Sequence, residues 1–140
     1  MYEPIRTKSV HSTTAAGSTD FPHRSREEEL DIQLAGHLAA LLALTDELRA
    51  LEPGTDLDTA AERLAAQVAR LRGGRASVRL TVAAAHPEPR PAALHRKAHT
   101  LAGRALVVAA SRADTAAAIL AAERMDAHSA ALEPRELASR

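Results

Sequence analysis

A regular series of apolar residues between Leu30 and Leu51 is the feature that most constrains the fold of this chain. Leucine recurs at alternating spacings of four and three residues, with one histidine at the third position of the series. Side chains with this spacing lie on one face of an α-helix. The series therefore predicts a long helix over about 26–52 that uses one face for interaction. Its first six members form the predicted interaction seam: Leu30, Leu34, His37, Leu41, Leu44 and Leu48.

Local signals place the ends of this helix and predict a second one. Ser25-Arg26-Glu27-Glu28 has the pattern of a capping box, and Pro53-Gly54 ends the helix. Thr55-Asp56-Leu57-Asp58 offers cap chemistry for a helix over 56–72, which the pair Gly73-Gly74 stops. The same spacing continues through it at Leu57, Ala61, Leu64, Val68 and Leu71. The two helices are expected to form an antiparallel hairpin.

The last third of the chain is predicted to form two further helices, over 92–110 and 113–132. A single helix over this length would extend about 60 Å, too long for a domain of this size. Ser111-Arg112-Ala113-Asp114 has the spacing of a new cap, and Pro134 lies beyond the last helix, followed by a tail over 134–140. One predicted seam consists of Leu94, Ala98, Leu101, Ala105 and Val108. The other consists of Ala118, Ala122, Met125, Ser129 and Leu132.

Two segments do not follow a helical rhythm. Residues 1–24 are rich in serine and threonine and are expected to be a disordered tail. Residues 77–83 alternate polar and apolar side chains, which favours a single short strand. A short helix is the other interpretation of this segment, and the Pro-rich stretch 86–91 after it reads as a stiff linker.

These elements predict an all-α fold, a four-helix bundle or paired helical hairpins in one domain over 25–133. The core is expected to be small, because 33 residues are alanine and only 28 are Leu, Ile, Val or Phe. The alanine seams indicate close approach of helices. A homodimer is expected, since a second copy would cover the remaining apolar surface.

Composition excludes several classes of function. The chain has no cysteine, so no disulfide framework, thiolate metal site or catalytic thiol exists. No secretory signal is evident, and the longest mostly apolar run, 32–45, is too short to cross a bilayer. A cytoplasmic protein is expected. Arginine outnumbers lysine 16 to 2, which is typical of a GC-rich bacterial genome.

No sequence motif points to an enzyme. The chain contains no Gly-x-Ser-x-Gly elbow, P-loop, dinucleotide fingerprint or Glu-x-x-His pair. Acidic pairs such as Asp46-Glu47 are better explained as solvent-facing charge. We therefore expect neither catalysis nor a cofactor.

Charge is distributed unevenly although the net charge is zero. Residues 27–62 carry ten acids and one arginine, whereas residues 63–112 carry ten basic residues and one acid. The simpler interpretation is that an acidic helix packs beside a basic segment. The alternative is nucleic-acid binding, with phosphate contacts from Arg63, Arg70, Arg72, Arg75 and Arg79.

Histidines give the third hypothesis. His95 and His99 are four residues apart on a predicted helix, a spacing that can hold a metal ion. The cations Arg96 and Lys97 between them disfavour a divalent metal, and the simpler interpretation is a pair of surface histidines. His37, within the leucine series, is expected to set register.

The function expected from the sequence is therefore protein binding. The chain would act as a small regulatory or interaction module through its leucine and alanine helix faces, with itself and an unknown protein as partners. The nucleic-acid regulator and the histidine metal site are the alternatives.

Overall fold

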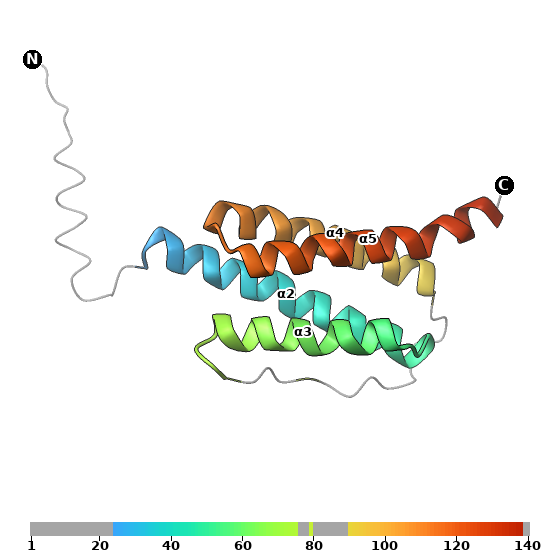
Figure 1. Cartoon of the computed structure of the whole chain (residues 1–140), viewed down its shortest axis with the longest axis horizontal. Coiled ribbons are helices and arrows are strands. Elements are labelled where there is room, and N and C mark those ends of the chain that lie inside the picture. The colour runs from blue at the N-terminus through green and yellow to red at the C-terminus, as the bar shows by residue number, and fades with distance from the viewer. Residues whose placement is uncertain (1–23, 76–78, 80–89, 139–140) are drawn as a thin grey trace, which may run out of the picture.

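Four helices make up the described part of the chain, and the all-α prediction is confirmed (Figure 1). The structure, a computed structural model, describes residues 24–75, 79 and 90–138. The predicted tail, except Arg24, and the predicted strand, except Arg79, lie outside the described residues. The helices are α2 (Arg26–Leu51), α3 (Thr55–Leu71), α4 (Pro91–Arg112) and α5 (Thr115–Ala138).

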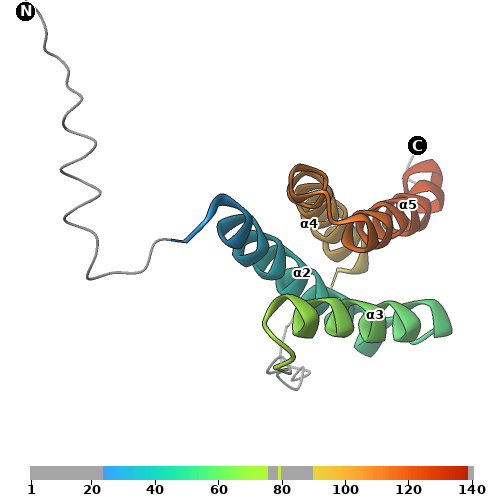
Figure 2. The ribbon, with the colours of Figure 1, turned by 60° about the vertical axis from the view of Figure 1, so that its left-hand side comes forward.

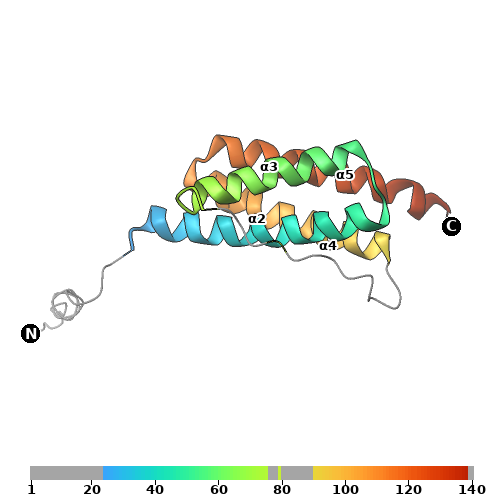
Figure 3. The same cartoon turned by 90° about the horizontal axis from the view of Figure 1, so that it is seen from below.

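The helices pair as two antiparallel hairpins, α2–α3 and α4–α5, which are stacked through α2 and α4 (Figure 2). Helix α2 packs against both α3 and α4, and α5 packs mainly against α4. Helices α3 and α5 touch only slightly. The α2–α3 turn and the start of α4 lie at one end of the bundle, and the α4–α5 turn lies at the other (Figures 1 and 3).

The core combines large side chains from one hairpin with small ones from the other. Leu34, Leu38, Leu41 and Leu64 are fully buried on the α2–α3 side. Helix α4 contributes a strip of alanines instead, each with no exposed surface: Ala98, Ala102, Ala105 and Ala109. Small side chains allow two helix backbones to approach closely, so this strip fits the close packing of α4 with α5.

The start of α2 is fixed by the predicted capping box. The Ser25 hydroxyl accepts a hydrogen bond from the Glu28 amide at 3.1 Å, and the Glu28 carboxylate accepts one from the Ser25 amide at 2.8 Å. The start of α3 differs from the prediction. Its N-cap is Gly54, without a side-chain cap, and Thr55 is already helical. Because Gly54 occupies the N-cap position, Thr55 is the first helical residue and its hydroxyl is not the cap.

Glycines end α3 as predicted. Gly73 and Gly74 both have positive φ, and their amides donate to the carbonyls of Arg70 and Ala69. This pair of bonds is the Schellman arrangement, which satisfies carbonyls at a helix C-terminus.

The α4–α5 corner lies two residues later in the chain than predicted. Helix α4 runs through Ser111, and the N-cap of α5 is Asp114, whose Oδ1 accepts from the Ala117 amide at 3.1 Å. The Asp114 amide also donates to the Ala109 carbonyl at 2.9 Å, which closes a Schellman arrangement around Ala113. Asp114 therefore ends α4 and caps α5. The prediction that Ser111 caps the last helix is wrong, because Ser111 lies inside α4.

We expect Ala113→Gly to stabilise the protein. Ala113 is left-handed, with φ 59° and ψ 35°, a conformation that costs an alanine about 1 kcal/mol and a glycine almost nothing. The greater freedom of glycine in the unfolded chain offsets part of this gain, so the expected increase is about 0.5 kcal/mol. Urea unfolding followed by far-UV circular dichroism measures it, and a decrease in stability would contradict the corner geometry.

The last helix continues beyond its predicted end at 132. Helix α5 runs through Pro134 to Ala138, so much of the predicted tail over 134–140 is helical. Proline removes the amide that would bond to the carbonyl of Ala130. Ala130 is exposed, so water can solvate that carbonyl, and the helix tolerates the proline near its end.

Candidate functional site

The arginines predicted to bind nucleic acid do not form one surface. Arg63 pairs with Glu123 on α5 at 2.7 Å, and Arg70 pairs with Asp114 at 2.8 Å. Arg79 donates two hydrogen bonds to Asp46 on α2. Arg72 and Arg75 are exposed near the end of α3. Three of the five thus neutralise acids of the same chain.

Most of the leucine series of α2 packs against the other helices of the same chain. Leu34, Leu41 and Leu48 have no exposed surface, while Leu30, Leu44 and His37 are partly buried. The first three cannot contact a partner while this fold is intact. Of the predicted seam, only Leu44 also lines the groove described next.

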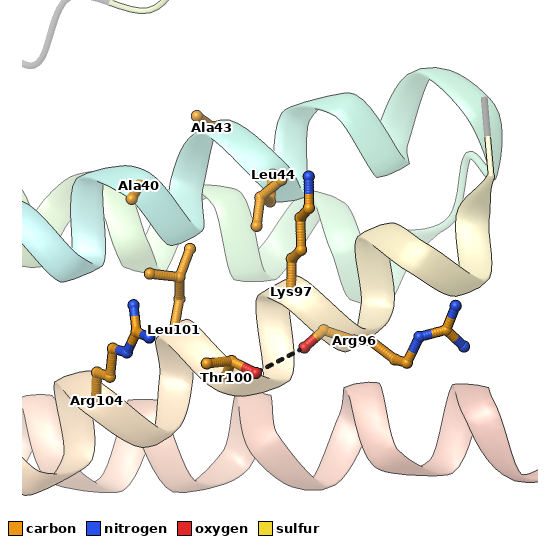
Figure 4. Close-up of a pocket in the computed structure, with 8 residues that line it drawn as sticks. All are labelled: Ala40, Ala43, Leu44, Arg96, Lys97, Thr100, Leu101 and Arg104. Atoms are coloured by element: carbon orange, nitrogen blue, oxygen red, sulfur yellow. Dashed lines mark hydrogen bonds between the residues drawn. The ribbon is translucent and has the colours of Figure 1, made fainter. Parts of the chain in front are cut away.

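An open groove runs between α2 and α4, with an apolar floor and a basic rim (Figure 4). Ala40, Ala43 and Leu44 of α2 line it together with Leu101 of α4. Thr100 also lines the groove, but its hydroxyl donates to the Arg96 carbonyl at 3.1 Å within its own helix. The rim carries three basic side chains from α4: Arg96, Lys97 and Arg104.

The three rim cations differ from the other basic residues of α3 and α4. Within the described part of the chain, Arg96, Lys97 and Arg104 make no ion pair with an acid, and all three are exposed. By contrast, Arg112 at the end of α4 pairs with Asp31 of α2 at 3.0 Å. The basic side chains of α4 that have no acidic partner in the described structure are therefore gathered at the groove.

A second candidate site is a polar network at the α2–α3 turn end of the bundle. The ring of His95, on α4, is buried between Glu52 and His128. Its Nε2 lies 3.0 Å from Glu52 Oε1, and its Nδ1 lies 2.9 Å from His128 Nδ1 on α5. One turn away on α5, Arg124 Nη1 lies 3.2 Å from Asp56 Oδ2 of α3. The network thus joins groups from all four helices.

The network buries polar atoms without partners. Nε and Nη2 of Arg124 and Nε2 of His128 are buried and have no hydrogen-bond partner in the structure. Burial, followed by the nearby charge of Arg124, lowers the pKa of His128 from 6.5 to about 3. His128 is therefore a neutral imidazole in the folded protein at neutral pH.

The predicted metal pair is not the pair that the fold assembles. His95 turns inward to His128, while His99 is only partly buried. Within residues 24–75, 79 and 90–138, no group of three or more histidine, aspartate or glutamate side chains is arranged to hold a metal ion. Glu52 and His128 contact opposite edges of the His95 ring, so these groups do not converge on a common point.

The predicted seam of α5 left out Arg124 and His128 because it was shifted along the helix. Over 115–134, where side-chain burial is described, the buried residues of α5 are Ala117, Leu120, Ala121, Arg124 and His128, not the series that starts at Ala118. Positions 117, 121, 124 and 128 repeat the four-three spacing of the other helices. That spacing was the signal available in the sequence. Two of its four positions are an arginine and a histidine, however, and polar residues are typical of a solvent-exposed helix face.

Comparisons with known proteins found no relative. No protein-family model matches the chain, no curated protein matches its sequence, and no solved structure matches its fold. Among the described residues, no helix is long and apolar enough to cross a membrane.

Proposed function

We propose that this chain is a protein-binding module whose α2–α4 groove holds an acidic amphipathic helix of a partner protein. The observation that carries the proposal is the coincidence of an apolar floor with three exposed cations that lack acidic partners in the described structure. A helix with one apolar face and flanking glutamates matches both parts of this surface. The charges would orient the partner, and the floor would supply affinity.

The floor favours a protein helix over a nucleic acid. Ala40 and Ala43 are exposed small side chains, so a partner helix can approach α2 closely. Phosphate groups gain little from a surface of methyl groups, and nucleic-acid binding relies on many cations in one field. Three of the arginines predicted for that role are neutralised by Glu123, Asp114 and Asp46.

The test uses a synthetic helical peptide of about 20 residues with alanine and leucine on one face and glutamate on its flanks. We expect the double variant Lys97→Glu with Arg104→Glu to bind this peptide at least tenfold more weakly than the wild type, a loss of about 1.4 kcal/mol. Both side chains lie on the groove rim, and the reversed charges repel the glutamates. Fluorescence anisotropy of a labelled peptide gives the dissociation constants.

A matched control separates the groove from general charge. Arg72→Glu with Arg75→Glu reverses two exposed cations near the end of α3, which are not groove residues. This variant should retain wild-type affinity. Equal losses in both double variants would show that only net charge matters. If the wild-type protein binds a labelled DNA duplex but does not bind the peptide, the nucleic-acid alternative is favoured instead.

The homodimer expected from the sequence stays a prediction beside this proposal. Val107 and Ile119, with 67% and 52% of their surface exposed, are the apolar side chains of α4 and α5 that a second copy would cover. Native mass spectrometry of the wild type at micromolar concentration measures the subunit number.

A further inference from the structure

Charged and titratable groups from α3, α4 and α5 lie around His128, although its ring is fully buried. Its own helix contributes Arg124, and α4 contributes His95 and His99. Asp56 approaches from the start of α3, and Glu52 reaches the His95 ring from the end of α2. The protonation state of the two rings therefore affects contacts among all four helices.

Hydrogen bonding fixes where the protons lie when both rings are neutral. Glu52 is a carboxylate that only accepts, so His95 Nε2 carries a hydrogen and donates to it. His95 Nδ1 is then an acceptor, and His128 Nδ1 donates across the 2.9 Å contact. This leaves His128 Nε2 as a bare acceptor, which is the buried nitrogen without a partner.

An additional proton cannot be accommodated in this arrangement. If His128 takes the proton, its Nε2 becomes an N–H group that has no acceptor in the structure. If His95 takes the proton at Nδ1, His128 must accept there, and its own hydrogen moves to Nε2. Either way, a buried N–H remains unsatisfied, and the cluster that contains Arg124 gains positive charge.

The opposite end of the bundle is held by two arginine–carboxylate ion pairs. Arg70 pairs with Asp114, and Arg112 pairs with Asp31. Burial alone would raise the pKa of Asp114, but the hydrogen bonds from Arg70 and the Ala117 amide outweigh it and lower that pKa below 3.8. Mild acid therefore leaves Asp114 ionised and its ion pair with Arg70 intact.

We propose that the His95–His128 contact is an acid-sensitive latch, which opens the α2–α3 turn end of the bundle when the histidine pair takes up a proton. In the opened state, the start of α4 and the facing part of α5 separate from Glu52 and Asp56, and water reaches Arg124 and His128. The α4–α5 turn end stays folded. The inference does not depend on the groove or on its partner.

The test is hydrogen exchange of the free wild-type protein, measured residue by residue by NMR at several urea concentrations. An opening linked to one proton on a ring with an ordinary pKa of 6.5 becomes about thirtyfold more frequent between pH 7.5 and pH 5. We expect amides at the end of α2 and beyond the first turn of α4 to lose protection by this factor. Their exchange should depend weakly on urea, because a local opening exposes little surface.

Amides on the far half of α4, such as those of Ala105 and Ala109, provide the internal comparison. They are expected to exchange only through complete unfolding, with a steep dependence on urea. Equal urea dependence at both ends would overturn the latch, and so would protection at the latch end that does not change with pH. Both results come from the wild type, so the test needs no variant to fold.

A variant pair identifies the titrating ring. His128→Asn places a polar amide where Nδ1 lies but cannot take up a proton, so the thirtyfold pH response should disappear. His37→Gln removes a partly buried histidine outside the network and should keep the full response. A response that persists when both His128 and His95 are replaced by asparagine would assign the proton to a group outside the pair and contradict the proposal.

Discussion

Lowering the pH from 7.5 to 5 is expected to reduce the free energy of unfolding by roughly 2 kcal/mol. The cause is His128, whose pKa falls from 6.5 to about 3 on folding because its ring is buried beside Arg124. Above pH 6.5 the ring is neutral in both the folded and the unfolded chain, so stability does not depend on its titration. Below pH 6.5 the unfolded chain takes up a proton that the folded chain excludes, and stability falls.

Asp114 does not contribute to this loss. Its pKa is lowered on folding, so the stability that it adds is present above its unfolded value of 3.8 and is lost only as the pH falls below that value. The window between pH 7.5 and pH 5 therefore isolates the histidine effect from the carboxylate effect at the α4–α5 corner.

Urea unfolding followed by far-UV circular dichroism measures this dependence, since the chain has no tryptophan. His128→Asn should be less stable than the wild type at pH 7.5 but should lose much less stability on acidification. His37→Gln should lose as much as the wild type. A wild-type stability that is level between pH 7.5 and pH 5 would show that His128 titrates normally in the folded chain.

Ala102→Leu is expected to destabilise the fold by about 2 kcal/mol. Ala102 lies in the alanine strip of α4 with no exposed surface, so three additional carbons must displace packed neighbours. Leucine and alanine both favour helix, so intrinsic helix propensity changes little. The loss therefore measures how closely α4 is packed into the core.

The matched control is Ala110→Leu on the same helix. Ala110 is exposed, so the larger side chain extends into water and stability should change by less than about 0.5 kcal/mol. The same urea unfolding measures both variants. Equal stabilities for the two would mean that the strip has room for larger side chains, contrary to the close packing of α4.

The helices were largely predictable because their signals are local. The capping box at Ser25, the turn at Pro53-Gly54 and the stop at Gly73-Gly74 depend on a few neighbouring residues. Boundaries were less predictable where tertiary contacts contribute. Asp114, not Ser111, caps the last helix, because it is placed both to close α4 and to pair with Arg70.

The candidate sites were not predictable, since charge and polarity mislead when partners are distant in the chain. His95 and His99 are neighbours by spacing, but the fold joins His95 to His128, which lies 33 residues away. Arg70 and Arg79 suggest a free basic surface, but acids 44 and 33 residues away neutralise them. The groove combines α2 with α4, and no local pattern links those helices.

Local sequence signals establish that the chain is all-α, where most of its helices begin and end, and that leucine and alanine form the core. These properties follow from backbone capping and from the period of the helix, which act over a few residues. The tertiary structure alone decided which cations stay unpaired, which polar groups are buried and how α5 is rotated. Those outcomes depend on distances between helices, which sequence spacing does not specify.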